Sequence, residues 1–292
     1  MPFTDFLDGL NPSEVYDYEI DGYHISDFMT GSSDIGRVKT KVFEHIPMDI
    51  HFGIKHKNRG KIESHLWFFE GFCNYLNPQY CFILDAGTAP LWKSLSRIVF
   101  HFEINPQLGG AAGEIEVMCP KNNEDGSQIS FYQDVLIMGQ YVEYKLSHYL
   151  DKATESFFGF VSVLPGAFSG FRWKAIKGEP LKQFLKGQSL FDSDKNSFPH
   201  CAVANMYLAE DRIMCLEIVA KQNNNYLLHY LPGCKALTDP AMGLIGMMKQ
   251  RRRWMNGSMF ASFHVLKNMC KIWERKNSFL RNIMFSALYI YM

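Results

Sequence analysis

YCFILDAG, residues 80–87, is the stretch that decides the fold class of this 292-residue chain. It is a short apolar run that ends in Asp85 and Gly87, which is the pattern of a buried strand with a loop at its carboxyl end. Before it, apolar residues recur at spacings of three and four, which predicts a helix over 61–76. After it, a second helix is predicted over 90–103. A strand between two helices indicates an α/β fold.

The alternation of strands and helices continues along the chain. Four further strands are predicted: one at 48–54, one that starts directly after GGAAG (109–113), one at 158–164 and one at 226–231. Further helices are predicted over 131–150, 208–222 and most of 240–272. This pattern predicts a largely parallel sheet, with ligands at the carboxyl ends of its strands. We therefore expect the chemistry in the loops after Leu84 and Leu164. GGAAG is too loose for a phosphate-binding loop, and we expect a turn there before Glu114.

The composition narrows the class of protein. Lys+Arg and Asp+Glu are both 30, so no global field favours a nucleic-acid partner, and any anion site must be local. Hydrophobic content of 47% argues against disorder. The seven cysteines form no CxxC pair, which indicates reduced thiols in a cytosolic compartment. The ten histidines show no metal-binding spacing.

The two ends of the chain give different signals. Residues 1–45 are polar and rich in Gly, Asp and Ser, and without a basic leader they do not resemble a secretory signal. No uncharged apolar run approaches the roughly 20 residues that a membrane helix needs. IMFSALYIYM, residues 283–292, is still apolar at its last residue. It is either the start of a membrane segment or a buried C-terminal helix.

Three acidic residues are candidates for chemistry. Asp85 either forms a turn before Gly87 or binds a hard divalent cation, which prefers carboxylate and phosphate oxygens. Glu210 and Asp211 open a predicted helix. Acidic residues there often serve only as caps or partners of the helix dipole. The alternative is a general base that takes a proton from a substrate hydroxyl.

KQRRRWMNGS, residues 249–258, is the sharper signal. On a helix, Gln250, Arg253 and Trp254 share a face, while Arg251 and Arg252 diverge from it. Such a basic helix is a solvated face, a membrane-surface helix, or a diphosphate site, because Arg offers planar bidentate donors to phosphate oxygens. The tryptophan would then stack on a sugar ring or lie in the core.

VLPGAFSGFR, residues 163–172, contains a Pro-Gly turn followed by small residues. It is either a tight connection or a place where backbone approaches a ligand closely.

Taken together, these stretches resemble chitin synthases, which are processive inverting glycosyltransferases related to cellulose and hyaluronan synthases. The match rests on HKNRGKIESHLWFF (56–69), ILDAGTAP (83–90), GGAAGEI (109–115), EYKLSHYLDKATESFFGFVSVLPGAFSGFRW (143–173), ANMYLAEDRIMCLEIVAK (204–221) and QRRRWMNGS (250–258). QRRRW marks the wider group, whereas VLPGAFS with NMYLAEDR points to chitin synthases in particular.

The resemblance implies a GT-A type, Rossmann-like mixed sheet that uses UDP-N-acetylglucosamine to extend a β-1,4 chitin chain. It implies that Asp85 coordinates Mg²⁺ or Mn²⁺ against the diphosphate, with Gly87 at the second acidic position of the DxD pair of related enzymes. Lys61 matches a lysine near the uridine. Asp211 would be the base that takes the proton from the acceptor 4-hydroxyl, accompanied by Glu210.

The remaining implied roles belong to the basic helix and the Pro-Gly turn. Gln250 and Arg253 would hold the diphosphate, and Trp254 the acceptor end. The residues implied at the entry to the polymer channel are Pro165, Gly166 and Ala167.

The resemblance also implies an organisation and a location. We expect a lead-in over 1–45, a catalytic domain over 46–245, and over 246–292 the QRRRW helix and the start of membrane-proximal helices. The catalytic portion would face the cytoplasm at the plasma membrane, and a second copy of the chain, in a homodimer, is among the expected partners. Two other hypotheses stay open: a hyaluronan- or cellulose-type synthase, and a non-catalytic relic or accessory subunit of a synthase.

Overall fold

The computed structural model describes residues 61–120, 122, 127–186, 204–205, 207–221, 224–273 and 279–291, together with 19–20, 23–24, 53 and 60. The chain divides into two compact units, Met1–Gly60 and Lys61–Met292. In the first unit, β1 (Glu19–Ile20) and β2 (Tyr23–His24) form an antiparallel pair. The strand predicted at 48–54 lies outside the described residues, except for Gly53.

The second unit is built on a five-stranded mixed sheet, which confirms the α/β class. The strand order is β3-β6-β5-β7-β4. The bounds are β3 Tyr80–Leu84, β4 Thr88–Pro90, β5 Leu108–Val117, β6 Phe168–Arg172 and β7 Leu227–Thr238. The predicted strands at 80–87 and 226–231 are therefore present, and the second one continues seven residues further.

The expectation of a largely parallel sheet was wrong. Among the described strands of this sheet only β5 and β7 pair in parallel, and the other three pairings are antiparallel. β6 begins beside the last residue of β3, where Phe168 pairs with Leu84, and it runs antiparallel to β3. The alternation of strands and helices along the sequence does not show in which direction each strand runs relative to its neighbours.

The strand predicted at 158–164 was also wrong. This stretch is buried, with Phe160 and Val161 fully enclosed, but it forms no strand, and the next strand is β6. Its backbone meets the sheet at Gly159, whose carbonyl accepts a hydrogen bond from Leu228 N of β7 at 3.0 Å. Two of its backbone donors are satisfied by side chains instead. Ser162 N donates to Glu155 at 2.8 Å and Leu164 N donates to the Cys215 sulfur at 3.2 Å. The apolar run therefore indicated that these residues are buried, but not that they form a strand.

GGAAG is not a turn but the centre of β5, and all five of its residues are buried. Added Cβ atoms would lie 2.2 Å from the Phe168 ring at Gly113 and 2.6 Å from Leu164 at Gly110. The glycines therefore let side chains of β6 and of the preceding segment pack directly on the β5 backbone.

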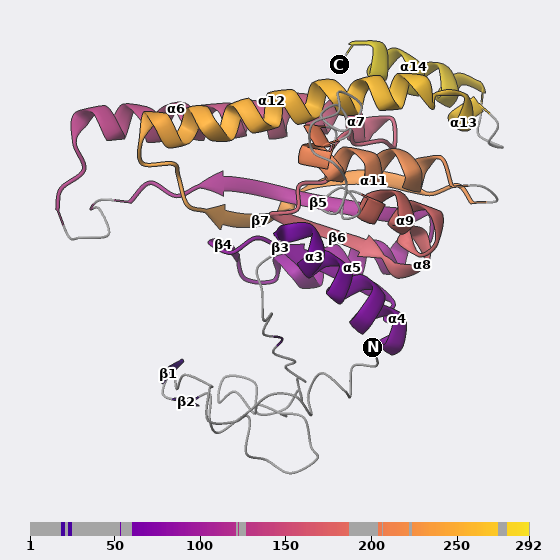
Figure 1. Ribbon diagram of the computed structural model, residues 1–292, viewed down its shortest axis with the longest axis horizontal. Helices are drawn as coiled ribbons and strands as arrows, with labels where there is room; N and C mark the ends of the chain where they lie inside the picture. The colour runs from indigo at the N-terminus through magenta and orange to yellow at the C-terminus, as the bar shows by residue number, and fades with distance from the viewer. Residues whose placement is uncertain are drawn as a thin grey trace. The chain divides into compact units, whose positions relative to one another are not determined.

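Helices cover the sheet on both sides (Figure 1). α5 (Ser94–Ile104) packs on β5 and β7 on one side. On the other side lie α6 (Phe131–Leu146), α7 (Ala153–Phe157) and α11 (Glu210–Val219), with α12 (Leu244–Lys267) packed on α11. The remaining helices are α3 Lys61–Leu66, α4 Asn74–Leu76, α8 Trp173–Ile176, α9 Glu179–Leu185, α13 Cys270–Trp273 and α14 Phe279–Tyr291.

Local sequence explains most of these helices. Ser130 and Gln133 form a capping box that starts α6, and Pro180 lies in the first turn of α9. The predicted helices at 61–76 and 131–150 each continue through a π-helical segment, Trp67–Cys73 and Ser147–Lys152. Such segments are rare and are frequently found at functional sites.

Two large hydrophobic clusters form the core, one on each face of the sheet, and a small third cluster joins Ile62, Tyr207 and Ile213. Neighbouring residues of β5 point to opposite clusters, Ala112 toward α11 and Ala111 toward α5. The six described cysteines are free, and Cys119 and Cys270 among them are exposed. Within the described ranges, no helix has both the length and the apolar content that a membrane crossing requires.

Candidate functional site

A cavity of about 820 Å³ opens where the loops after β3 and before β6 meet the start of α11 and the middle of α12. All ten residues that the sequence singled out line it: Lys61, Asp85, Pro165, Gly166, Ala167, Glu210, Asp211, Gln250, Arg253 and Trp254. The structure therefore brings together five segments that are up to about 190 residues apart in the chain.

Asp85 lies directly after β3, at the carboxyl end where the sequence placed it. Its backbone carbonyl accepts a hydrogen bond from Thr88 N at 3.0 Å, which closes the turn through Gly87. Gly87 has φ +84°, a conformation that favours glycine. A Cβ there would also lie 2.7 Å from a carboxylate oxygen of Asp239. The turn therefore needs glycine for both its backbone and its space.

Lys61, in the first turn of α3, forms an ion pair with Asp85, with 2.9 Å between Nζ and Oδ1. Burial lowers the pKa of Lys61, but the negative charges of Asp211, Asp85 and Glu210 outweigh it, so the net pKa is raised. The ammonium is therefore charged at neutral pH and faces acidic groups from two different elements.

Gly166 connects the Pro-Gly turn to the acidic helix. Its N–H donates to Asp211 Oδ2 at 3.0 Å. An added Cβ would lie 2.8 Å from Lys61 Nζ and 3.5 Å from both carboxylate oxygens of Asp211. Backbone, cation and carboxylate thus converge within a few ångströms.

Glu210 and Asp211 form a partly enclosed acidic pair at the start of α11. Burial raises the pKa of Glu210 to about 7, and the charge of Asp211 adds to this effect. Burial also raises the pKa of Asp211, while Lys61 and the Gly166 N–H oppose that rise. Two neighbouring carboxyl groups with raised pKa values can hold or accept a proton near neutral pH.

The QRRRW segment lies on α12, and Gln250, Arg253 and Trp254 share the face that lines the cavity, as the helical spacing predicted. Arg252 is exposed and lies outside the cavity lining. Gly257 brings the helix close to the acidic pair, because a Cβ there would lie 2.9 Å from the Cβ of Ala209. This contact fixes the distance between α12 and the start of α11.

Arg251 does not simply diverge from the tryptophan. Its guanidinium lies 4.4 Å from the centre of the Trp254 ring and forms an ion pair with Glu143 of α6, with 2.6 Å between Nη2 and Oε2. The ring of Tyr144 lies 6.4 Å from that of Trp254. Helices α6 and α12 therefore clamp the indole at the cavity wall.

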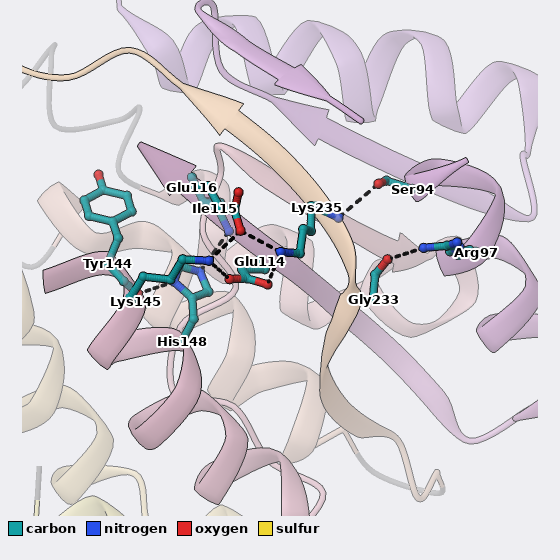
Figure 2. Close-up of polar contacts among 10 residues, drawn as sticks. All are labelled: Ser94, Arg97, Glu114, Ile115, Glu116, Tyr144, Lys145, His148, Gly233 and Lys235. Carbon is teal, nitrogen blue, oxygen red and sulfur yellow. Dashed lines mark hydrogen bonds and ion pairs between the residues drawn. The ribbon is translucent and has the colours of Figure 1, made fainter. Parts of the chain in front are cut away.

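A charged network lies behind the cavity wall (Figure 2). Lys145 of α6 and Lys235 of β7 both contact Glu114 and Glu116 of β5. The Glu114 side chain is fully buried. The hydrogen bonds of both lysines lower the pKa of Glu116 to about 2. The network ties α6 to the sheet and so fixes the helix that carries the cavity residues at 143–148.

Sequence reasoning assigned no roles to the cavity residues of the EYKLSHYLDK segment. Tyr144, His148 and Lys152 line the cavity from α6 and from the π-helical segment that follows. The family resemblance covered this stretch, but a helical pattern could not show which side chains face the cavity. The π-helical segment changes the phase of the helix, and sequence periodicity does not report it.

Asp85 is the carboxylate that the sequence assigned to a divalent cation; it lines the cavity and pairs with Lys61. Within the described ranges, no three His, Cys, Asp or Glu side chains form a group that could hold a metal. A cation with one or two protein carboxylates and ligand phosphates for its other positions still fits this donor set. The residues present therefore suit a cation that arrives with a phosphate ligand.

Comparison with known proteins places the chain. Residues 8–269 match the family model of the chitin synthase-like glycosyltransferase domain. The chain belongs to the chitin synthase family. Chitin synthase 2 of Mycosarcoma maydis is 38% identical over 268 residues, which are 91% of this chain and 24% of that relative.

Two further similar proteins are also chitin synthases. Chitin synthase 1 of Phytophthora sojae is 35% identical over 99% of this chain and 32% of its own length. Chitin synthase 1 of Saccharomyces cerevisiae is 39% identical over 85% of this chain and 21% of its own length. This chitin synthase-family chain thus spans between about a fifth and a third of these curated relatives.

Proposed function

We propose that this chain is the catalytic portion of a chitin synthase with a GT-A type fold. It would transfer N-acetylglucosamine from UDP-N-acetylglucosamine to the 4-hydroxyl of a growing β-1,4 chitin chain, with inversion. The observation that carries the proposal is that Asp85, Asp211 and Arg253 line one cavity, in a chain of this family.

In the proposed reaction, Asp211 accepts the proton of the acceptor 4-hydroxyl as the oxygen attacks the anomeric carbon. The bond to UDP breaks, and its electron pair leaves on the β-phosphate oxygen. The raised pKa of Asp211 makes it a stronger base than an ordinary aspartate. Gly166 orients this carboxylate, because its N–H donates to Oδ2.

Cationic side chains would stabilise the departing diphosphate. Arg253 and Gln250 face the cavity from α12, and Lys61 faces it from α3. Fixed donors placed where charge develops lower the barrier without reorganising during the reaction. A bound Mg²⁺ or Mn²⁺ would supply further neutralisation of the phosphate charge, with Asp85 as its protein ligand.

The acceptor chain would lie against Trp254 and the Pro165–Gly166–Ala167 turn. The indole is 36% exposed, and the Arg251–Glu143 pair holds it in place. An exposed, immobilised aromatic ring at a cavity wall is suited to stacking on a sugar face. The turn places backbone beside Asp211, where a channel for the acceptor would have to begin.

The experiment is to compare the unmodified chain with Asp211→Asn and with the control Asp151→Asn, which changes an exposed aspartate. We expect Asp211→Asn to reduce transfer by about 10²–10⁴-fold while UDP affinity stays within a few-fold. Transfer is measured as UDP release with Mn²⁺, and UDP affinity by calorimetry. Retained turnover together with lost nucleotide binding would contradict the role of Asp211.

The same measurements separate the alternatives. Product from UDP-N-acetylglucosamine alone supports the chitin type, whereas a requirement for a second donor indicates the hyaluronan type and use of UDP-glucose the cellulose type. A chain that binds UDP and releases none from the donor, even with Mn²⁺ and membranes, would be a relic or an accessory subunit.

We also propose that the domain works at the cytoplasmic face of the plasma membrane. Large apolar side chains are exposed along α12 and α14, among them Ile245, Met255 and Phe279 at 71–72%. Such side chains are suited to contact with lipid or with membrane helices. Failure of the chain to co-sediment with lipid vesicles would contradict this placement, and its molar mass in solution tests the proposed homodimer.

A further inference from the structure

Lys152 is a buried cation that the proposed reaction does not use. It ends the π-helical segment Ser147–Lys152, is only 6% exposed, and lines the cavity. Within the described residues, its one hydrogen bond joins Nζ to His148 Nε2 at 3.2 Å, and it forms no ion pair. A buried ammonium with a single neutral partner is costly, unless a ligand supplies further acceptors.

The protonation state of His148 explains how Lys152 is held. His148 Nδ1 lies 2.7 Å from the carbonyl oxygen of Tyr144, which can only accept, so the Nδ1–H donates this hydrogen bond. Its Nε2 is then an acceptor, and it receives hydrogen bonds from Ile115 N at 3.3 Å and from Lys152. Burial and the charge of Lys152 lower the pKa of His148 to about 3, so the ring stays neutral. The ring thus accepts a hydrogen bond from one of the three N–H groups of the Lys152 ammonium, and the other two N–H groups can donate to a ligand.

The charges around Lys152 favour a neutral ligand over a phosphate. Glu155 and Asp211 are the carboxylates whose charges act on it, and Arg212 is the opposing cation. Burial lowers the pKa of Lys152 to about 8, so that most molecules carry the charge at neutral pH. A phosphate next to these two carboxylates would be repelled, whereas the hydroxyl and acetamido oxygens of a sugar accept hydrogen bonds without carrying charge.

We propose that Lys152 binds the transferred sugar, with its ammonium donating hydrogen bonds to sugar oxygens inside the cavity. The inference rests on the proposed function, in which the reacting sugar lies beside Asp211 and the diphosphate beside Arg253. Lys152 would then distinguish a nucleotide sugar from the nucleotide alone. Arg253 and Lys61 would serve both ligands equally.

The test compares UDP-N-acetylglucosamine with UDP, by calorimetry with Mn²⁺, on the unmodified chain and on Lys152→Met. Methionine keeps the length of the side chain and removes its donors. We expect the affinity for the nucleotide sugar to fall by about 10-fold or more and that for UDP to stay within about 2-fold. Lys174→Met, which removes an exposed lysine outside the cavity lining, is the matched control and should change neither.

Thermal unfolding adds a readout that separates binding from a structural role. If Lys152 serves the ligand, the melting temperature of the ligand-free Lys152→Met chain should stay the same or rise, because an unmatched buried charge is lost. Lys152→Gln, which restores an N–H donor, should recover part of the discrimination between the two ligands.

Each other outcome overturns the assignment. Equal weakening of UDP and of the nucleotide sugar would make Lys152 a phosphate contact, and unchanged affinities for both would remove it from the site. A lower melting temperature with both affinities reduced would make it a structural residue. If the unmodified chain bound neither ligand, the proposed function itself would fail, and this inference with it.

Discussion

Lys61, Gly166 and Asp211 show how little space the candidate site leaves at its centre. The lysine contacts Asp85 on one side, and the position of a Gly166 side chain would fall between its ammonium and the Asp211 carboxylate. A glycine is therefore needed for the cation and the carboxylate to approach each other across the turn. Sequence motifs showed that each residue type was present, but not that one backbone N–H orients the carboxylate.

At the residue scale we predict that Arg253→Ala weakens UDP binding through the diphosphate. Arg253 faces the cavity, and in the described residues it forms no hydrogen bond or ion pair that would hold it away from a ligand. We expect UDP affinity to fall by about tenfold and uridine affinity to stay unchanged, because charge-assisted hydrogen bonds to phosphate are lost. Calorimetry with both ligands measures this difference.

Arg252→Ala is the matched control for this prediction. It removes the same charge from the neighbouring position, whose side chain is exposed and lies outside the cavity lining. It should leave both affinities as they are. Equal loss of uridine affinity in Arg253→Ala would instead place the arginine near the base or show that the cavity has changed shape.

At the scale of elements, β5 determines how the two layers of helices meet. Its GGAAG segment is buried, and the glycines admit Phe168, Leu164 and Tyr226 to within contact of the backbone. One and three residues after this segment, the same strand carries Glu114 and Glu116, which anchor α6 through Lys145. One strand therefore fixes both the core beneath the cavity and the helix along its wall.

We predict that Gly113→Ala strongly destabilises the chain. The new methyl group would lie 2.2 Å from the Phe168 ring and 2.4 Å from the backbone carbonyl of Cys234, so both strands would have to move. We expect a loss of about 2–4 kcal/mol in the free energy of unfolding, somewhat above the usual cost of overpacking, because one obstacle is backbone. Urea unfolding measures it.

Gly139→Ala makes the same chemical change where the structure leaves room. Gly139 is exposed on α6, and no atom lies within 4 Å of the added Cβ. Alanine there should stabilise the chain by roughly 0.5–1 kcal/mol, since glycine is a poor residue in a helix interior. A similar loss from both substitutions would show that the effect at Gly113 is not steric.

At the scale of the whole molecule, buried histidines make stability depend on pH. His65 lies between Phe184 and Phe69, and burial lowers its pKa from 6.5 to about 4. His148 behaves in the same way, with a pKa of about 3. In the unfolded chain both take up a proton near pH 6.5, while in the folded chain they do not. Their contribution is therefore complete above that pH and is lost as the pH falls toward 4 and 3.

We predict that the free energy of unfolding falls between pH 7 and pH 5 by about 2 kcal/mol for each of these two histidines. His65→Phe removes one of them, and because His65 Nδ1 is buried without a hydrogen bond, the substitution leaves no described partner unsatisfied. Urea unfolding at both pH values should show a loss about 2 kcal/mol smaller in His65→Phe. An unchanged loss would mean that His65 is protonated in the folded chain.

Glu116 extends this dependence to lower pH. The hydrogen bonds of Lys145 and Lys235 lower its pKa from 4.5 to about 2, so it stabilises the fold fully above pH 4.5 and loses that effect as the pH falls toward 2. The charged network behind the cavity should therefore be among the last interactions that acid disrupts.

Of the residues that line the cavity, the sequence and its family resemblance predicted ten but not Tyr144, His148 or Lys152. The fold class, several helices and the strand that begins at Tyr80 followed from the sequence alone. Local patterns suffice for these features, because helical spacing and the composition of a strand end are properties of neighbouring residues. They also sufficed for the face shared by Gln250, Arg253 and Trp254, which needs only the helical repeat.

The direction of β6, the place of GGAAG inside β5, and the contacts of Lys152, His148 and Arg251 became visible only in the tertiary structure. Each depends on contacts between residues far apart in the chain: Leu84 with Phe168, Gly113 with Cys234, Arg251 with Glu143. Burial, hydrogen-bond partners and the pKa values that follow from them arise only when distant segments pack together, and no local pattern encodes them.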